Sequence, residues 1–472
     1  MRLAIKKVIA SWLLKPLLSG LNSYRLHATK NIYSCPLDMK LLLLFVSLLF
    51  STVSFAQKQA ETIVTTDIDN FWIAYDQIIK STDSAEKYKL LEQHFISKGS
   101  PGLKAMMTAR SYTSKSYIDA IERYPLYWKS IRKATFGAKR YSKEISANVA
   151  KLKLLYPYLK PAKVYFTVGA FRSGGTTLDS LVLIGSEIAM ADKNVNTSEL
   201  ESSMPGLAKY LKTNPVSSLV FTNVHEYVHT QQKTTLAQNL LGQCILEGVA
   251  EFVAEKATGI PSKLPALKIG KENKKRVEEV FKSTMFNESN GFWLYSDLEN
   301  EFGVRDLGYY VGYAICESFY DKSQDKSAAI RKMIEIDCNN QNDLIHFADE
   351  SGYFENSVSE LAKKYEVSRP TVIAISEIAD QKVMESSVKQ ITIKFSEVMD
   401  KSRRNFEFGP LGKDNVLVIK KMLGFSEDGR SLSFEVELEN GKQYQLVVGP
   451  GFRNIGGISL KPYLIDFKTK TD

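Results

Sequence analysis

His225, Glu226 and His229 lie within five residues of one another and form the pattern H-E-x-x-H. Histidine and glutamate are residue types that bind metal ions or act beside them. The apolar residues between about 217 and 232 recur with the period of a helix, which predicts that the motif is helical. Residues four apart share one face of a helix, so both imidazoles can bind the same metal ion. Glu226 is then placed beside them as the base for a metal-bound water.

Two histidines do not complete a catalytic zinc site, which usually has three protein ligands and one open position. Segment 230–235 contains no further histidine, but the next helical run offers Glu247, 18 residues after His229. We expect Glu247 to be the third ligand of one Zn2+. Glu251, one turn later, would hold a ligand histidine through its other ring nitrogen. The alternative is that both carboxylates are solvated charges on a helix surface.

Peptide hydrolysis at such a site needs a proton acceptor and a donor for the developing oxyanion. Glu226 is predicted to take the proton of the water and return it to the leaving amine. Tyr309 and Tyr313 share a helix face and are predicted to be the catalytic donors, although both could instead be core aromatics. A strand at 181–184 or 187–190 would bind a peptide by edge pairing.

The N-terminal segment is typical of an export signal. An apolar run from 41 to 50 follows Met39, and a small-x-small site ends at Ala56. The run is shorter than the roughly 20 residues needed to cross a membrane. We therefore expect residues 1–56 to be an upstream extension and signal peptide, with the true start at Met39 and cleavage after Ala56. The protein would be secreted or periplasmic in a bacterium, with no membrane span after removal of the signal.

The charge and the cysteines exclude two further classes of protein. Seven of the 62 Lys and Arg and one of the 53 Asp and Glu lie in residues 1–56, which leaves 55 bases and 52 acids beyond them. This balance does not indicate binding to nucleic acid. Three cysteines, an odd number, also remain beyond residue 56, so no disulfide framework is expected.

The order of the predicted elements is that of an α+β protein. Helical periodicity over residues 57–160 predicts a helical N-terminal part of the protease region. Residues 161–366 then begin with a small sheet and continue as helices, which we interpret as the catalytic domain. Beyond Arg369 and Pro370, six or seven short alternating strands predict an all-β sandwich over residues 370–472.

These motifs resemble known families. The combination of His225-Glu226-x-x-His229 with Glu247-Gly-x-Ala-Glu251 is similar to the gluzincin metalloproteases, the thermolysin-like and aminopeptidase-like group. Residues from about 163 to 322 also resemble an uncharacterised family of predicted zinc-dependent proteases. The resemblance implies a mostly helical zincin fold of the gluzincin type, in which His225, His229 and Glu247 bind zinc and Glu226 is the base. The aminopeptidase signature G-x-M-E-N is absent from the sequence, so specificity for a free N-terminus is not implied.

The C-terminal residues resemble a second family. The segment from Ile391 to Asp400, I-T-I-K-F-S-E-V-M-D, is similar to a strand of bacterial Ig-like domains. Such domains usually act as spacers or adhesion modules, so this one would contact the cell surface or other proteins.

The sequence thus predicts an exported zinc metallopeptidase acting on a peptide or protein substrate. Two alternatives stay open. One is a secreted zinc-binding or adhesion protein with an inactive site, and the other is a zinc hydrolase of non-peptide amides.

Overall fold

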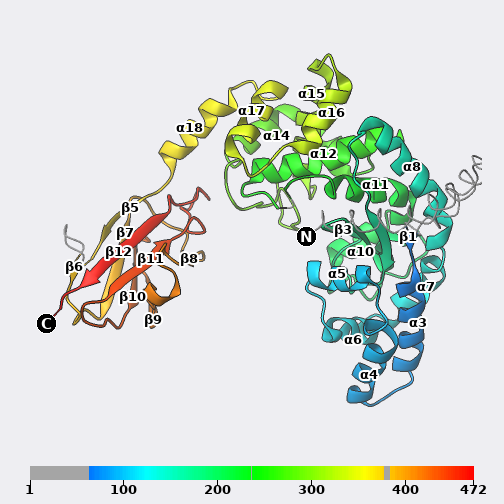
Figure 1. The fold of residues 1–472 in the computed structure, drawn as a ribbon, viewed down its shortest axis with the longest axis horizontal. Coiled ribbons are helices and arrows are strands. Elements are labelled where there is room, and N and C mark those ends of the chain that lie inside the picture. Colours follow the sequence, from blue (N-terminus) through cyan, green and yellow to red (C-terminus); the bar gives the residue numbers. More distant parts are fainter. Residues whose placement is uncertain (1–62, 235, 377–382, 472) are drawn as a thin grey trace, which may run out of the picture. The chain divides into compact units, whose positions relative to one another are not determined.

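The computed structural model describes residues 63–234, 236–376 and 383–471 (Figure 1). The expected extension, start at Met39 and cleavage after Ala56 lie outside these residues. The described chain is α+β, as expected: helices and a small sheet come first, and a mainly antiparallel β region follows. Within the described ranges, we find no helix with both the length and the apolar character needed to cross a membrane.

The first region is built mostly from helices. Its strands are β1 (Ile63–Val64), β2 (Lys163–Thr167), β3 (Gly175–Leu178) and β4 (Leu181–Gly185). Its longer helices are α3 (Thr66–Ile78), α4 (Ser84–Leu91), α5 (Pro101–Ala109), α6 (Ser114–Arg123), α7 (Pro125–Thr135), α8 (Ser142–Leu155), α11 (Leu219–His229), α12 (Leu240–Thr258), α13 (Pro265–Glu272), α14 (Lys274–Lys282), α15 (Leu307–Lys322), α16 (Lys326–Glu335), α17 (Gln341–Ser351) and α18 (Val358–Ser368). Two short helices, α9 (Ser186–Ala189) and α10 (Pro205–Leu211), follow the sheet.

The sheet has the strand order β1-β2-β4-β3. The first three strands are parallel, and β3 pairs antiparallel with β4 at one edge. This arrangement corrects two expectations for the peptide-binding strand. Residues 181–184 lie in β4, which is paired on both sides, and residues 187–189 are helical in α9. The edge strand β3 begins at Gly175.

Helices α11 and α12 carry the predicted metal site, and both are buried. In α12, apolar or small residues cover every face of the helix, so 17 of its 19 residues are buried. The Asn239 side chain caps its start by accepting a hydrogen bond from the Gly242 N–H. The strongly apolar α11 packs against α12 and against strands β3 and β4. The site is therefore held between a helix pair and the edge of the sheet.

Helix α12 of the pair α11–α12 also packs closely against α15. A Cβ atom at Gly248 would lie only 2.0 Å from the backbone carbonyl carbon of Gly312. A Cβ atom at Gly312 would lie 1.7 Å from the carbonyl oxygen of Cys244. Only glycine lets the two backbones approach so closely. The crossing brings the start of α15 next to the segment of α12 that contains Glu247.

The second region consists of two four-stranded sheets, with the orders β5-β7-β10-β9 and β6-β12-β11-β8. The strands are β5 (Val372–Ile375), β6 (Val383–Met384), β7 (Gln390–Phe395), β8 (Phe406–Glu407), β9 (Lys421–Phe425), β10 (Ser431–Glu435), β11 (Gln443–Val448) and β12 (Tyr463–Thr469). Alternating buried residues of β7 and β10 share one hydrophobic core with those of β11 and β12.

The cysteines of the described chain are all unpaired. Cys244, Cys316 and Cys338 are free and buried. Burial raises the pKa of each of the three thiols, that of Cys338 to about 12. They therefore act as small apolar side chains of the helical core.

Candidate metal centre

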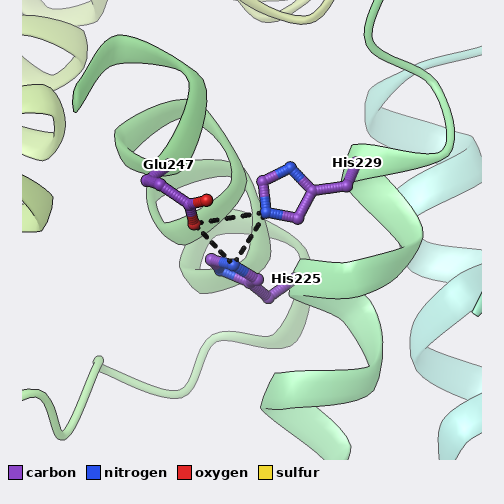
Figure 2. A group of neighbouring side chains, drawn as sticks. All are labelled: His225, His229 and Glu247. Carbon is purple, nitrogen blue, oxygen red and sulfur yellow. Dashed lines mark hydrogen bonds and ion pairs between the residues drawn. The ribbon is translucent and has the colours of Figure 1, made fainter. Parts of the chain in front are cut away.

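The three predicted ligands come together between α11 and α12 (Figure 2). The Nε2 atoms of His225 and His229 are 3.1 Å apart, because a spacing of four residues puts both rings on one face of α11. Oε2 of Glu247, from α12, lies 3.4 Å from Nε2 of His225 and 3.3 Å from Nε2 of His229. Figure 2 shows all three side chains pointing at one another. This buried group can hold a metal ion.

The other ring nitrogen of each histidine faces a protein oxygen. Nδ1 of His225 lies 2.9 Å from Oε2 of Glu251, whose Oε1 accepts a hydrogen bond from the Ser262 hydroxyl. Glu251 therefore contacts the second ring nitrogen of His225, as its predicted role of holding a ligand histidine requires. Nδ1 of His229 lies 2.7 Å from Oε1 of Gln232. Such contacts orient the rings and leave Nε2 for the metal.

Gln232 was not predicted from the sequence. Its side-chain Nε2 donates to the carbonyl oxygen of Leu246, 2.9 Å away. The amide of Gln232 is thereby fixed, so its Oε1 is held in place opposite His229. The available signal was its position three residues after His229, which places it within reach of the same ring.

Tyr295 is a second residue that sequence reasoning missed. Its hydroxyl donates to Oε1 of Glu247 at 2.5 Å and accepts from Nε2 of Gln243 at 3.0 Å. The backbone of Tyr295 has a φ of 59°, in the left-handed region, and its N–H donates to Oδ1 of Asp306. Tyr295 lies in an irregular segment between α14 and α15, where no periodicity could have indicated its direction.

The charges of the group favour a bound cation. Burial alone would lower the pKa of His225, but Glu247 and Glu251 raise it well above its usual value. Burial would raise the pKa of Glu247, but His229 and His225 hold it well below its ordinary range. The histidines thus favour the ionised form of Glu247, which is the form that binds a metal ion.

Glu226 lies beside the group and is not one of its ligands. Its side chain is buried against the edge strand, because a Cβ atom at Gly175 would be 2.6 Å from Oε1 of Glu226. Burial raises the pKa of Glu226, although His225 and His229 oppose this effect. A carboxylate with a raised pKa is a better proton acceptor near neutral pH.

The structure separates the two predicted tyrosines. The ring of Tyr309 is stacked beside that of His225, with centroids 6.2 Å apart. The hydroxyl of Tyr313 donates to Oε1 of Glu255 at 2.9 Å, and its ring packs against Phe252. Tyr309 thus lies at the candidate metal centre, whereas the contacts of Tyr313 are with residues outside it.

Comparisons with known proteins add no family. No protein-family model matches the chain, and no curated protein matches it. The N-terminal part of the bacterial S-layer protein SbsC is similar to this chain with a TM-score of 0.18 and 14% identity, over 85% of this chain and 69% of that one. The S-layer protein rSbsC(31-844) gives the same TM-score and identity, over 76% of this chain and 45% of its own. At this TM-score neither likeness supports a statement about fold or function.

Proposed function

We propose that the chain is an exported zinc metallopeptidase of the gluzincin type. The observation that carries the proposal is the triangle of ligand atoms from His225, His229 and Glu247, with the buried carboxylate of Glu226 next to it. A peptide or protein would be the substrate. The C-terminal β region would be a bacterial Ig-like sandwich that contacts the cell surface or other proteins.

The dimensions of the triangle fit zinc. Zn–N and Zn–O bonds of about 2.05 Å at tetrahedral angles separate the ligand atoms by about 3.3 Å. The three separations in the group are 3.1, 3.3 and 3.4 Å. Two imidazoles and one carboxylate are also a frequent ligand set of catalytic zinc, which keeps its fourth position open.

The residues of the chain would divide the reaction between them. When bound, zinc lowers the pKa of a water ligand towards ~7 and polarises a carbonyl group. Glu226 accepts the proton of the attacking water and passes it to the leaving amine. Tyr309 is the better placed of the two predicted oxyanion donors, because its ring lies against His225. Tyr313 would need to leave Glu255 to take part.

The test combines metal analysis with one substitution. Purified protein should contain one zinc per chain and should cleave peptides in a mixed library. Glu226→Gln should keep the zinc and lose at least about 100-fold in kcat/KM, because general-base catalysis contributes about that much or more. Glu144→Gln, at an exposed position of α8, is the matched control and should have wild-type activity.

The other outcomes separate the alternatives. Protein without stoichiometric zinc would refute the proposal. Protein that binds zinc and cleaves amides of cell-wall fragments, but no peptide, would be a hydrolase of non-peptide amides. Protein that binds zinc and cleaves neither would be a binding or adhesion protein with an inactive site.

A further inference from the structure

Tyr295 belongs to the irregular segment between α14 and α15, and its backbone is tied to the start of α15. Its N–H donates to Oδ1 of Asp306 at 2.7 Å. Two residues earlier, the carbonyl oxygen of Trp293 accepts a hydrogen bond from the Gly308 N–H at 2.8 Å, and the ring of Trp293 is buried. The position of Tyr295 is therefore coupled to the first turn of the helix that packs closely against α12.

The backbone of Tyr295 adopts a conformation that a tyrosine rarely takes. Its φ is 59°, and that of its partner Asp306 is 61°. The left-handed region is disfavoured for residues with a Cβ atom, most of all for bulky ones. Such conformations persist where the surroundings enforce them, and they cluster at functional sites. With the backbone in this turn, the hydroxyl of Tyr295 reaches two side chains of α12.

That hydroxyl belongs to a chain of hydrogen bonds with a fixed direction. The N–H of Ala237 donates to Oε1 of Gln243 at 3.0 Å, which orients the amide so that its Nε2 donates. This Nε2 donates to the oxygen of Tyr295 at 3.0 Å. The single hydroxyl proton of Tyr295 is then directed to Oε1 of Glu247, 2.5 Å away. Gln243 and Glu247 are four residues apart, so both lie on the face of α12 that Tyr295 contacts.

The bond from Tyr295 gives the two oxygens of Glu247 different partners. Oε1 accepts the hydroxyl, whereas Oε2 lies 3.4 Å from Nε2 of His225 and 3.3 Å from Nε2 of His229. A carboxylate can bind a metal ion through one oxygen or through both. A second oxygen on the ion would take up the position that catalytic zinc keeps open. A donor that occupies Oε1 therefore favours binding through Oε2 alone.

We propose that Tyr295 is a positioning residue that holds Glu247 as a one-oxygen ligand of the ion. This inference rests on the proposed function, because it assigns a role towards the proposed zinc. Tyr295 acts through Glu247 and needs no contact with the ion or the substrate. Hydrogen-bond partners of metal ligands change metal affinity about 10- to 100-fold when they are removed.

The first test is the zinc affinity of Tyr295→Phe, which keeps the ring and removes only the hydroxyl. Metal-free protein is titrated with zinc in competition with a fluorescent indicator. Tyr295→Phe should bind zinc about 10- to 100-fold more weakly than the wild type, because the carboxylate of Glu247 is no longer held. Tyr158→Phe is the matched control, since Tyr158 is 56% exposed and Tyr295 is 51% exposed, and it should keep wild-type affinity. Equal affinity in Tyr295→Phe and wild type would refute the proposal.

Cobalt substitution separates positioning from a merely structural contribution. The visible absorption of bound Co2+ depends on the number and arrangement of its ligands. Tyr295→Phe should change this spectrum, because Oε1 of Glu247 becomes free to reach the ion, whereas Tyr158→Phe should reproduce that of the wild type. A structural contribution would lower the stability of metal-free and metal-loaded protein alike and would leave the zinc Kd and the cobalt spectrum unchanged. That result would overturn the proposal.

Neither measurement requires cleavage, so this inference and the proposed function can fail separately. Weakened zinc binding and an altered cobalt spectrum in Tyr295→Phe, with no peptide cleaved by the wild type, would support Tyr295 and refute the peptidase. Zinc-dependent cleavage by the wild type, with unchanged affinity and spectrum in Tyr295→Phe, would support the peptidase and refute the role of Tyr295. A wild type that binds neither zinc nor Co2+ would refute both.

Discussion

The two ring nitrogens of each candidate ligand histidine, His225 and His229, face different partners. Nε2 of both rings faces Oε2 of Glu247, and the Nδ1 atoms face oxygens of Glu251 and Gln232. An acceptor opposite Nδ1 favours the tautomer with its proton there, which leaves the lone pair of Nε2 free. The carboxylate of Glu251 does this for His225, and a neutral amide does it for His229. The two ligands are therefore oriented by groups of different charge.

Replacing the neutral partner tests this orientation. Gln232→Ala should weaken zinc binding about 10- to 100-fold, since the His229 ring loses the oxygen that holds it. The measurement is a competition titration with a chromophoric chelator. Gln231→Ala is the matched control, because the Gln231 side chain bonds the backbone of Lys160 instead. Equal zinc affinity in wild type and Gln232→Ala would show that Gln232 does not orient the ligand.

At the scale of elements, a buried carboxylate fixes the loop between β2 and β3. Glu187, in α9, accepts hydrogen bonds from the N–H groups of Gly169 and Phe171, at 2.8 and 3.2 Å. The Tyr127 hydroxyl donates to the backbone oxygen of the same residue. Phe171 has a φ of 67°, so the loop is held in a turn that most residues avoid. This contact positions the edge strand next to Glu226.

Glu187 should also make stability depend on pH. Burial raises the pKa of its carboxyl from 4.5 to about 7. Between these pH values the folded protein keeps a proton that the unfolded chain has lost, so the free energy of unfolding falls as pH rises. The loss should reach about 3 kcal/mol at pH 8 relative to pH 4.5.

Urea unfolding of wild type and Glu187→Gln, from pH 4.5 to 8, measures this contribution as a difference. The wild type should lose stability relative to the variant as pH rises, because the glutamine cannot ionise. Glu144→Gln should follow the wild type throughout. Parallel curves for wild type and Glu187→Gln would mean that this carboxyl does not titrate in the folded protein over that range.

Some helices of the first region could be predicted from the sequence, whereas the segment after β4 could not, and the difference has a physical reason. The buried residues of α3 recur with the helical period, so this helix could be located from its apolar residues. Helix α12 is buried on nearly every face, and its length of 19 residues is what distinguishes it from a buried strand. Residues 188–190 are uniformly apolar, and such a short run does not distinguish a strand from a helix. The lack of side chains at Gly174 and Gly175 makes room for Ile188 and Glu226, which the sequence alone could not show.

The candidate site shows the same division. His225 and His229 could be paired from their spacing, because helix geometry converts a spacing of four into a shared face. Glu247 was expected from its place in the next helical run, where the chain can turn back towards the histidines, and the structure brings it to them. The contact of Tyr295 with Glu247 depends on irregular backbone at Tyr295, where spacing has no such meaning.

At the scale of the molecule, the described chain has two hydrophobic cores. One contains buried residues from Ile63 to Val358, and the other contains residues from Met384 to Phe467. The candidate metal ligands all belong to the first region. A bound ion would link α11 to α12 and would therefore stabilise only the region that contains them.

Removal of the metal should consequently affect one of two unfolding transitions. With free zinc at about 1,000 times its Kd, binding contributes about 4 kcal/mol. A chelator should then lower the midpoint of the helical region by roughly 10 °C. Scanning calorimetry with and without chelator should leave the transition of the β region in place. A shift of both transitions, or of neither, would contradict the assignment of the ion to α11 and α12.

The three free cysteines would have a consequence in the oxidising medium that the proposed export implies. In the folded state their thiols are buried and protonated, so oxidants and other thiols do not react with them. An unfolded chain exposes all three, and wrong cross-links can then form before it refolds. Each opening event risks permanent loss of the molecule, so its working lifetime would be set by the rate of unfolding and not by the equilibrium between the two states.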